Sequence, residues 1–394
     1  MTDQRQDDRL RGLTFTRQLP SPADPVRGTF VVEQMRATAD QVDWSAIVPV
    51  AWPLRHPGAR VPHKGEIAGF PAQWPRYPVL PRRMLFTTVG GSMARGARSA
   101  FEHVVDERAP QFVHAHELYP SGAAAAALAG KAGLPLVVTI HGSDLYSNLV
   151  RPEWTEALYK VVSAADAIVC VSPRLADDAM SLIGADVGRV HVIPDVFDDE
   201  RFSFFTRTPH EGPTRLLSVG RLVEVKGYDV LIHALGELVR SGADVTLRLV
   251  GSGRLESDLR VIAVAEGVAE RVEFAGALSP TALSREMAAA DLYVQPSRRE
   301  GFGVALVEAL ATGLPVVATD SGGPADIVVP SSGVLVEPDD VAALVTGLRF
   351  VLDRLGAFDG SVIAADARSR FGRLAIAPRL VAVYRAAIAR EVPA

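Results

Sequence analysis

The sequence predicts an α/β protein made of two Rossmann-like domains, and three observations support this fold class. The chain has 394 residues, which is more than one hydrophobic core usually supports. Short β-branched runs alternate with amphipathic stretches, a pattern typical of βαβ units and a parallel sheet. A polar stretch with prolines, over 193–213, separates two such series, as a linker does. The composition, 48% hydrophobic and 22% charged, is that of a folded globular chain.

The second series, over 214–374, shows the alternation most clearly and is expected to form a C-terminal domain. Its predicted strands are Arg215–Val219, Val245–Val250, Val272–Phe274, Leu292–Val294 and Pro315–Thr319. Its predicted helices are Tyr228–Arg240, Arg254–Glu266, Pro280–Ala290 and Val304–Thr312. Strands that alternate with helices in this way build a Rossmann-like parallel sheet.

The first half, over 1–192, shows a looser version of the same alternation and is expected to form the N-terminal domain. Its predicted strands are Gln111–His114, Leu136–Ile140 and Ala167–Val171. Its predicted helices are Ala123–Ala132 and Thr155–Ala165. A further helix is expected near the end of the chain, over Leu374–Ala389.

The composition speaks against several classes of protein. There are 41 Lys and Arg against 46 acidic residues, a net charge of -5, so a polycation that binds nucleic acid is not expected. Cys170 is the only cysteine, which excludes an internal disulfide and a Cys-rich zinc site and favours a reducing compartment. Met1–Arg11 lacks the apolar core of a secretory signal, and the Ala-rich stretch Ser121–Gly130 is too short to cross a bilayer. We therefore expect a cytoplasmic protein.

The charge is unevenly distributed along the chain. The first 100 residues contain 14 Lys and Arg but 8 Asp and Glu, and all four tryptophans lie in the first half. Basic and aromatic surface suits contact with anionic lipid or with a phosphorylated acceptor, although the placement can also arise by chance. Peripheral contact with an anionic membrane is therefore one expectation.

Two cations are predicted at the C-terminal edge of the second sheet, where parallel sheets bind ligands. Gly220 and Arg221 directly follow a predicted strand, and Lys226 lies five residues later at the start of a helix. This placement favours a phosphate-binding role, with a solvated loop as the alternative. Gly251 and Gly253 follow the next strand, but Glu256 stands where a dinucleotide fingerprint needs its third glycine, so a dehydrogenase is disfavoured.

The most informative segment is Glu300 to Val317. Gly301, Phe302 and Gly303 form a glycine-flanked aromatic turn before an apolar helix that begins at Val304. The N-terminus of such a helix offers free N–H groups and a positive dipole end to an anion. Glu308 lies within the helix among apolar residues, so its carboxylate must reach either solvent or a hydrogen-bonding partner such as a sugar diol.

These motifs together resemble the donor-site signature of the family 4 retaining glycosyltransferases. The likeness rests on Glu300 and Glu308 with seven residues between them, the Gly-Phe-Gly turn and the Gly-Leu-Pro-Val-Val strand that follows. Thr139–Asp144 resembles the His-Gly loop of that family. Ser21–Phe30 resembles its N-terminal glycine loop, in the variant of cell-envelope polysaccharide enzymes of the teichuronic acid type. The fold implied is GT-B, two Rossmann-like domains that face each other across a cleft.

The resemblance also implies roles for individual residues. Arg221 and Lys226 would hold the donor diphosphate, Glu308 the ribose, and Glu300 with the backbone of 301–303 the donor sugar. His141 would reach that sugar from the N-terminal domain. The remaining implied positions are Gly220, Gly251 and Val304 at the donor site and Gly28 and Thr29 in an acceptor-side loop. The helix over 375–394 would cross back onto the first domain.

The activity implied is retaining transfer of a sugar from a nucleotide-diphosphate donor to a hydroxyl acceptor. This describes a hexosyltransferase of envelope or extracellular polysaccharide synthesis, acting on a glycan or lipid-linked acceptor at the inner face of the plasma membrane. Fixed cations can stabilise the leaving diphosphate, so neither a metal ion nor a cofactor is expected. A GT-B nucleotide-sugar epimerase and a non-catalytic nucleotide-sugar-binding subunit are the alternatives.

Four further residues bear on this interpretation. Asp326 stands where the family usually has Glu after a Gly-Gly-Pro stretch, and Asp195 opens Asp-Val-Phe where the family commonly has Asn-Gly-Val. These departures concern donor geometry more than the type of reaction. His114 and His116, with only Glu117 beside them, are weak evidence for a metal site, so we expect them to be structural.

Overall fold

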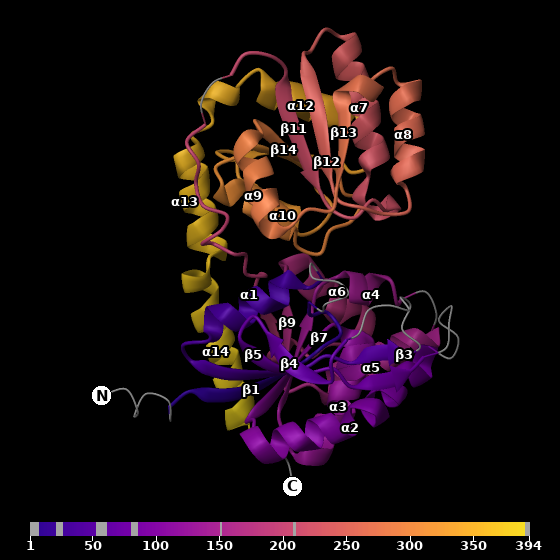
Figure 1. The fold of residues 1–394 in the computed structure, drawn as a ribbon, viewed down its shortest axis with the longest axis vertical. Helices are drawn as coiled ribbons and strands as arrows, with labels where there is room; N and C mark the ends of the chain where they lie inside the picture. Colours follow the sequence, from indigo (N-terminus) through magenta and orange to yellow (C-terminus); the bar gives the residue numbers. More distant parts are fainter. Residues whose placement is uncertain are drawn as a thin grey trace. The chain divides into compact units, whose positions relative to one another are not determined.

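The structure is a computed structural model, and it describes residues 8–20, 27–52, 61–79, 86–149, 152–207 and 210–390. The chain forms two compact units (Figure 1). Residues 1–196 and 376–394 form the first, here called the N-terminal unit, and residues 197–375 form the second, the central unit.

The boundary between the units differs from the linker predicted over 193–213. Most of that stretch belongs to the central unit, which begins at Phe197. Phe197 and Phe202 are buried, and Arg207 donates hydrogen bonds to the carbonyl oxygens of Ala290 and Thr312. Apolar burial and these hydrogen bonds therefore fix a segment whose composition alone indicated a free linker.

The N-terminal unit is built on a sheet with the strand order β10-β9-β8-β7-β1-β2-β5-β4, as far as the described residues show. Its strands are β1 Leu10–Phe15, β2 Val42–Ile47, β4 Lys64–Ile67, β5 Phe70–Gln73, β7 Phe112–His116, β8 Leu136–Ile140, β9 Ala167–Cys170 and β10 Val190–Val192. The pairs are parallel except β4 with β5. A separate parallel pair joins β3 Val50–Trp52 to β6 Arg76–Pro78.

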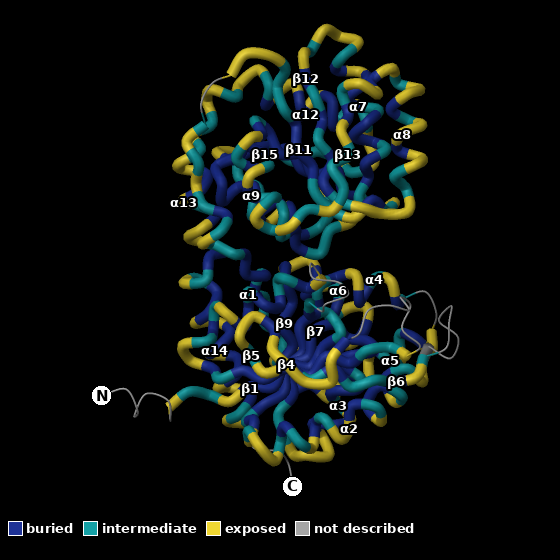
Figure 2. The backbone as a smooth tube through the Cα atoms, in the orientation of Figure 1, coloured by how far each residue is buried: buried dark blue, intermediate teal, exposed yellow. Residues whose placement is uncertain are grey.

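Helices cover this sheet, so β7 and β8 are buried along their whole length (Figure 2). The helices are α1 Thr29–Thr38, α2 Val89–Arg108, α3 Ala123–Ala132, α4 Ser143–Tyr146, α5 Pro152–Ala164, α6 Pro173–Ile183 and α14 Arg373–Ala389. From Ile376 onward, α14 belongs to the N-terminal unit and contributes to its hydrophobic core. Tyr384 is fully buried, and its ring stacks on Phe112 with 4.5 Å between the ring centroids.

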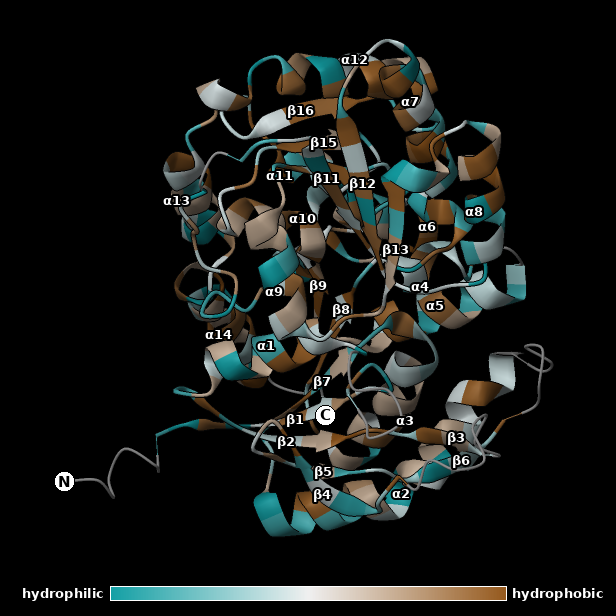
Figure 3. Cartoon of the chain, turned by 45° about the horizontal axis from the view of Figure 1, so that its top comes forward, coloured by the Kyte–Doolittle hydropathy of each residue, from teal (hydrophilic) through white to brown (hydrophobic). Residues whose placement is uncertain are grey.

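The central unit contains an all-parallel sheet with the order β13-β12-β11-β14-β15-β16 among the residues described. Its strands are β11 Thr214–Val219, β12 Val245–Val250, β13 Val272–Gly276, β14 Leu292–Gln295, β15 Val316–Thr319 and β16 Gly333–Val336. Its helices are α7 Tyr228–Arg240, α8 Glu256–Ala265, α9 Pro280–Ala289, α10 Val304–Ala311, α11 Pro324–Ile327, α12 Val341–Leu352 and α13 Gly360–Phe371. The strands are mainly hydrophobic, whereas α8 carries both hydrophilic and hydrophobic residues (Figure 3).

The strand order of each sheet reverses at one place, next to its first strand. In the central unit the reversal lies between β11 and β14, and in the N-terminal unit it lies between β1 and β7. In open α/β sheets, ligands bind outside the carboxyl ends of the strands at such a reversal. The topology therefore directs attention to the residues that follow β11 and β14, and to those that follow β1 and β7.

Candidate functional site

In the central unit, the reversal brings together Lys226 and Glu300, two of the residues singled out in the sequence. Lys226 ends a short 3-10 helix after β11, and Glu300 lies in the loop after β14. The Lys226 Nζ atom lies 2.5 Å from Glu300 Oε2. The two side chains are 21% and 15% exposed, so the ion pair is partly shielded from water.

Further hydrogen bonds fix the position of Glu300. Its Oε2 atom also accepts hydrogen bonds from Ser297 Oγ, at 3.2 Å, and from Gln295 Nε2, at 3.4 Å. Its backbone N–H donates to the carbonyl oxygen of Ser321, and its carbonyl oxygen accepts from the N–H of Gly323. The carboxylate is therefore held on both its side chain and its backbone. Gln295 and Ser297 were not singled out in the sequence, because neither belongs to a recognisable motif.

The glycines after β11 and β12 allow the two strand ends to approach each other closely. Gly251 has a φ of +140°, and a Cβ atom there would lie 1.9 Å from the carbonyl oxygen of Gly220. No other residue type fits this position without moving the backbone. Arg221 follows Gly220 and is exposed at the same edge of the sheet.

The loop before α10 is anchored by an aromatic contact. Phe302 is buried, and its ring meets Phe371 edge-on, with 5.6 Å between the centroids. Its side chain thus belongs to the core of the central unit. Val304 is the first residue of α10, and the residue before it, Gly303, has no side chain that could accept a hydrogen bond from the first N–H groups of the helix. The first N–H groups of a helix have no intrahelical partner.

Glu308 lies on α10 and is partly buried. Burial raises the pKa of Tyr293 well above its ordinary value, and nearby Tyr228 and the charges of Glu300 and Glu308 raise it further. Glu300 and Glu308 therefore act on the same buried phenol. The Tyr293 hydroxyl donates a hydrogen bond to Gln295 Oε1 at 3.3 Å.

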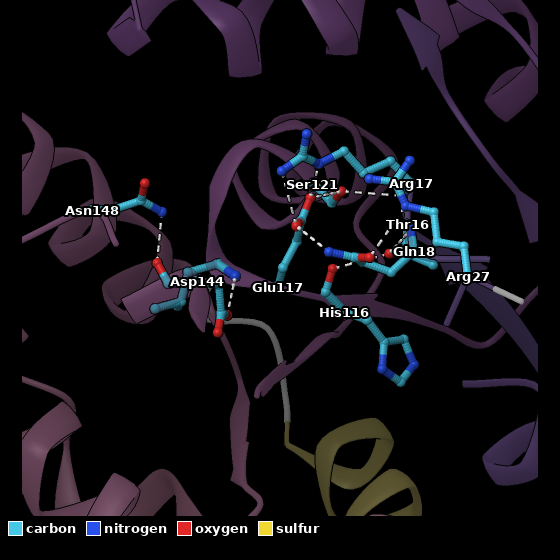
Figure 4. A network of polar contacts seen from close by, with 10 residues as sticks. Thr16, Arg17, Gln18, Arg27, His116, Glu117, Ser121, Asp144 and Asn148 are labelled. Atoms are coloured by element: carbon cyan, nitrogen blue, oxygen red, sulfur yellow. Dashed lines mark hydrogen bonds and ion pairs between the residues drawn. The ribbon is translucent and has the colours of Figure 1, made fainter. Parts of the chain in front are cut away.

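In the N-terminal unit, the reversal between β1 and β7 places Arg17 beside Glu117 (Figure 4). Arg17 Nε lies 2.6 Å from Glu117 Oε1, which also accepts from Ser121 Oγ at 2.8 Å. Gln18 Nε2 donates to the second carboxylate oxygen at 3.1 Å. Glu117 is buried and has a φ of +74°. Nothing in the sequence indicated this network, because Glu117 stands out there only as a neighbour of His114 and His116, and its partners Arg17 and Gln18 lie about 100 residues earlier.

Gly28 precedes α1, which begins at Thr29. It has a φ of +62°, and a Cβ atom there would lie 1.5 Å from the carbonyl oxygen of Gln18. The backbone of the α1 N-terminus therefore packs directly against the loop after β1. The remainder of the predicted glycine loop, residues 21–26, lies outside the described residues.

His141 follows β8 and is nearly buried, with 11% of its side chain exposed. Its Nδ1 atom lies 3.3 Å from the Asp195 carboxylate, and its Nε2 atom lies 3.2 Å from His116 Nδ1. The Phe30 ring, on α1, lies 4.6 Å from the His141 ring. Burial alone would lower the pKa of His141, but the charge of Asp195 raises it above the ordinary value.

The other two histidines of this region are buried in the N-terminal unit, as expected of structural residues. His114 Nε2 lies 2.7 Å from Thr139 Oγ1, and its Nδ1 lies 3.1 Å from the Tyr384 hydroxyl. Burial lowers the pKa of His114 to about 3 and also lowers that of His116. Within the described ranges, no group of three or more His, Cys, Asp or Glu is arranged to hold a metal ion.

A cavity of about 550 Å³ in the central unit lies away from these residues, at the amino ends of β11, β12 and β13. Its arginines are engaged by acids: Arg248 pairs with Glu286 and Arg215 with Asp291. It therefore presents no excess of positive charge to a phosphate. None of the helices within the described ranges is both long and apolar enough to span a membrane.

Two family descriptions match the chain and together span most of it. Residues 199–355 match "Glycosyl transferases group 1", and residues 54–201 match "Glycosyltransferase Family 4". A glycogen synthase of Mycobacterium tuberculosis is 33% identical over 287 residues, 71% of this chain and 69% of that protein. A D-inositol 3-phosphate glycosyltransferase of Catenulispora acidiphila is 35% identical over 305 residues, 70% of this chain and 72% of that protein.

Solved structures show the same fold. A sucrose-phosphate synthase of Thermosynechococcus elongatus superposes with a TM-score of 0.79 at 20% identity, over 96% of this chain and 98% of that one. The Anabaena protein HepE, in complex with UDP and glucose, superposes with a TM-score of 0.73 at 20% identity, over 95% and 99%. Together with the sequence matches, these findings show that the chain is a glycosyltransferase with the GT-B fold and belongs to glycosyltransferase family 4.

Proposed function

We propose that the chain transfers a hexosyl group from a nucleotide-diphosphate sugar to a hydroxyl group, with retention of the anomeric configuration. The observation that carries this proposal is the Lys226–Glu300 pair at the reversal point of the central sheet. A cation for the diphosphate and a carboxylate for the sugar hydroxyls lie side by side there. The two ends of a nucleotide-diphosphate sugar need these two kinds of group.

The chemistry of the leaving group fits the charges at this edge. Cleavage of the bond between the sugar and the diphosphate leaves negative charge on the phosphate oxygens. We assign its stabilisation to Arg221, to Lys226 and to the free N–H groups at the start of α10. Fixed protein charges can provide this stabilisation, so we propose that the reaction proceeds without a metal ion or a cofactor.

The remaining roles follow from the family resemblance. We assign Glu308 to the ribose hydroxyls, Glu300 to the donor sugar and His141 to the same sugar. Gly28 and Thr29 belong to the acceptor-side loop. The Anabaena protein HepE, which has the same fold, was solved with UDP and glucose, the kind of ligand proposed here.

We further propose that the acceptor is a glycan or lipid-linked glycan of envelope or extracellular polysaccharide synthesis, at the cytoplasmic side of the membrane. The support is the basic character of the first 100 residues, with 14 Lys and Arg against 8 acidic residues. Basic segments are attracted to anionic lipid. Sedimentation with vesicles that contain anionic lipid, compared with neutral vesicles, tests this contact.

A thermal-shift panel of UDP, GDP, ADP and their common sugars tests the donor site. A ligand at 100 times its Kd should add about 2.7 kcal/mol to the free energy of unfolding. The stabilisation should disappear in Lys226→Ala and Glu308→Ala. Lys160→Ala is the matched control, because Lys160 is an exposed lysine of the N-terminal unit. If none of these nucleotides stabilises the wild-type protein, the proposed donor site is wrong.

The stereochemistry is tested by NMR of the first product formed from the donor identified by this panel. Transfer with retention gives the same anomer as the donor, and transfer should continue in the presence of EDTA. An inverted product would contradict the proposed reaction, and loss of activity with EDTA would contradict the metal-free mechanism. Conversion of the donor without an acceptor into an isomeric nucleotide sugar would indicate an epimerase instead.

A further inference from the structure

The surroundings of His141 define its protonation more closely than the family resemblance does. Asp195 follows β10, is 8% exposed, and directs both carboxylate oxygens at His141 Nδ1, each at 3.3 Å. The backbone N–H of His141 donates to Asp144 Oδ1 at 3.1 Å. The ring and the backbone of His141 are therefore fixed by two different carboxylates.

The second ring nitrogen of His141 faces another histidine. His141 Nε2 lies 3.2 Å from His116 Nδ1, and the two rings are within 17° of parallel. A hydrogen bond between two imidazoles requires one nitrogen to donate and the other to accept. If Asp195 accepts the Nδ1–H of His141, a neutral His141 has a bare Nε2, and His116 must then donate. A charged His141 donates at both nitrogens.

The neighbouring charges decide between these two arrangements. The acidic groups near His141 are Asp195, Asp144 and Glu117, and its other titratable neighbours are His114 and His116. The three carboxylates favour the positively charged form of the His141 ring. Burial disfavours charge on all three histidines, but among them the nearby carboxylates raise only the pKa of His141, so the positive charge of this cluster belongs on His141. Phe30 covers another side of the ring with an aromatic surface.

We propose that Asp195 is a positioning residue that orients His141 and holds it as an imidazolium, with His116 as the acceptor of its second N–H. The proposal rests on the proposed function, in which His141 acts on the donor sugar. Both ring N–H groups are then engaged by Asp195 and His116, and an imidazolium has no free lone pair, so His141 offers the donor sugar its positive charge and cannot act as a general base. A carboxylate that fixes the orientation of a histidine in this way is a common arrangement in enzyme sites.

This assignment has a definite consequence for the pH profile. Because the pKa of His141 is raised, its positive charge is present at low pH and is lost as the pH rises through that pKa. Activity that depends on the imidazolium therefore falls on the alkaline side. A general base in the same position would lose activity on the acidic side instead.

The test is a histidine NMR titration of the full-length wild-type chain and of Asp195→Asn, with His141→Gln used to assign the resonance. We expect the wild-type His141 midpoint to lie above 6.5. In Asp195→Asn it should fall by roughly 1–3 pH units, the effect of removing an opposite charge at this distance. Asp178→Asn is the matched control, because Asp178 is also a partly buried carboxylate of the N-terminal unit, bonded to Tyr146.

The alkaline limb of kcat/KM, measured with the donor from the thermal-shift panel, should move to lower pH by the same amount in Asp195→Asn. Asp195→Glu retains the charge and should restore the wild-type limb. A wild-type midpoint below 6.5, an unchanged midpoint in Asp195→Asn, or an unchanged activity limb would each overturn the proposal. The NMR titration does not depend on transferase activity. If the midpoints behave as expected but no transfer is found, the proposed function fails rather than the pairing of Asp195 with His141.

Discussion

The Lys226–Glu300 ion pair should contribute measurably to the stability of the central unit. The perturbation is a double-mutant cycle of Lys226→Met, Glu300→Gln and the two together, which isolates the energy of the pair itself. The Lys226 ammonium and the Glu300 carboxylate are in direct contact, so they form a charge-assisted hydrogen bond. Each side chain retains some exposure, 21% and 15%, so water weakens the pair to some extent.

The expected coupling energy lies between two known limits. Exposed ion pairs are worth about 0.2–1 kcal/mol, and breaking a buried pair costs about 3–5 kcal/mol. A partly shielded pair should therefore couple by about 1–2 kcal/mol. The Lys160–Glu156 pair gives a matched control cycle, because it spans 2.7 Å but is 70% and 63% exposed. Its coupling should be much weaker than that of the Lys226–Glu300 pair, because water screens both of its charges.

The assay is urea unfolding followed by two signals. All four tryptophans belong to the N-terminal unit, so their emission reports that unit, whereas circular dichroism reports both units. The variants should shift the circular dichroism transition and leave the tryptophan transition in place. A coupling energy below about 0.3 kcal/mol would refute this reasoning, since it would mean that the two charges do not interact in solution.

Three other predictions concern single positions. Gly251→Ala should unfold at a much lower urea concentration than wild type, because its Cβ would lie 1.9 Å from the carbonyl oxygen of Gly220. The control is Gly267→Ala, which has a φ of +72° but open space around it and should lower the free energy of unfolding by about 1 kcal/mol. Equal losses in the two variants would contradict this reasoning. Burial lowers the pKa of His114 to about 3, so stability should fall as the pH drops from 6.5 toward 3, and urea midpoints of His114→Gln should show a shallower acid slope; an unchanged slope would count against it. Burial raises the pKa of the Cys170 thiol to about 12, so a thiol reagent should label it only upon unfolding, and rapid labelling of the native protein would oppose this.

Elements with a strong local pattern could be predicted from the sequence. Ala123–Ala132, Leu136–Ile140, Tyr228–Arg240 and Val245–Val250 have the same bounds in the structure as in the prediction. Strands β1 and β2 were not predicted. The β1 sequence, Leu-Arg-Gly-Leu-Thr-Phe, mixes charged and apolar residues, and its burial comes from pairing with β2 and β7 rather than from its own pattern.

The candidate site could be predicted only in part, because its contacts join distant segments. The sequence predicted Lys226 at the edge of the sheet, and the family resemblance implied a donor-site role for both Lys226 and Glu300. Their pairing depends on β14 lying next to β11, which spacing does not reveal. Asp195 was noticed as a departure from the family pattern. Its contact with His141, 54 residues earlier, appears only when β8, β9 and β10 are placed side by side.

The core of the N-terminal unit depends on Tyr384, near the end of the chain, because its ring packs against Trp44 and Phe112. Residues 1–196 are therefore synthesised long before the helix that completes their core. The central unit, 197–375, is contiguous and already synthesised by then. Domains usually mature in the order of translation. Here the segment made first is completed last, because its core lacks Tyr384 until α14 has been synthesised.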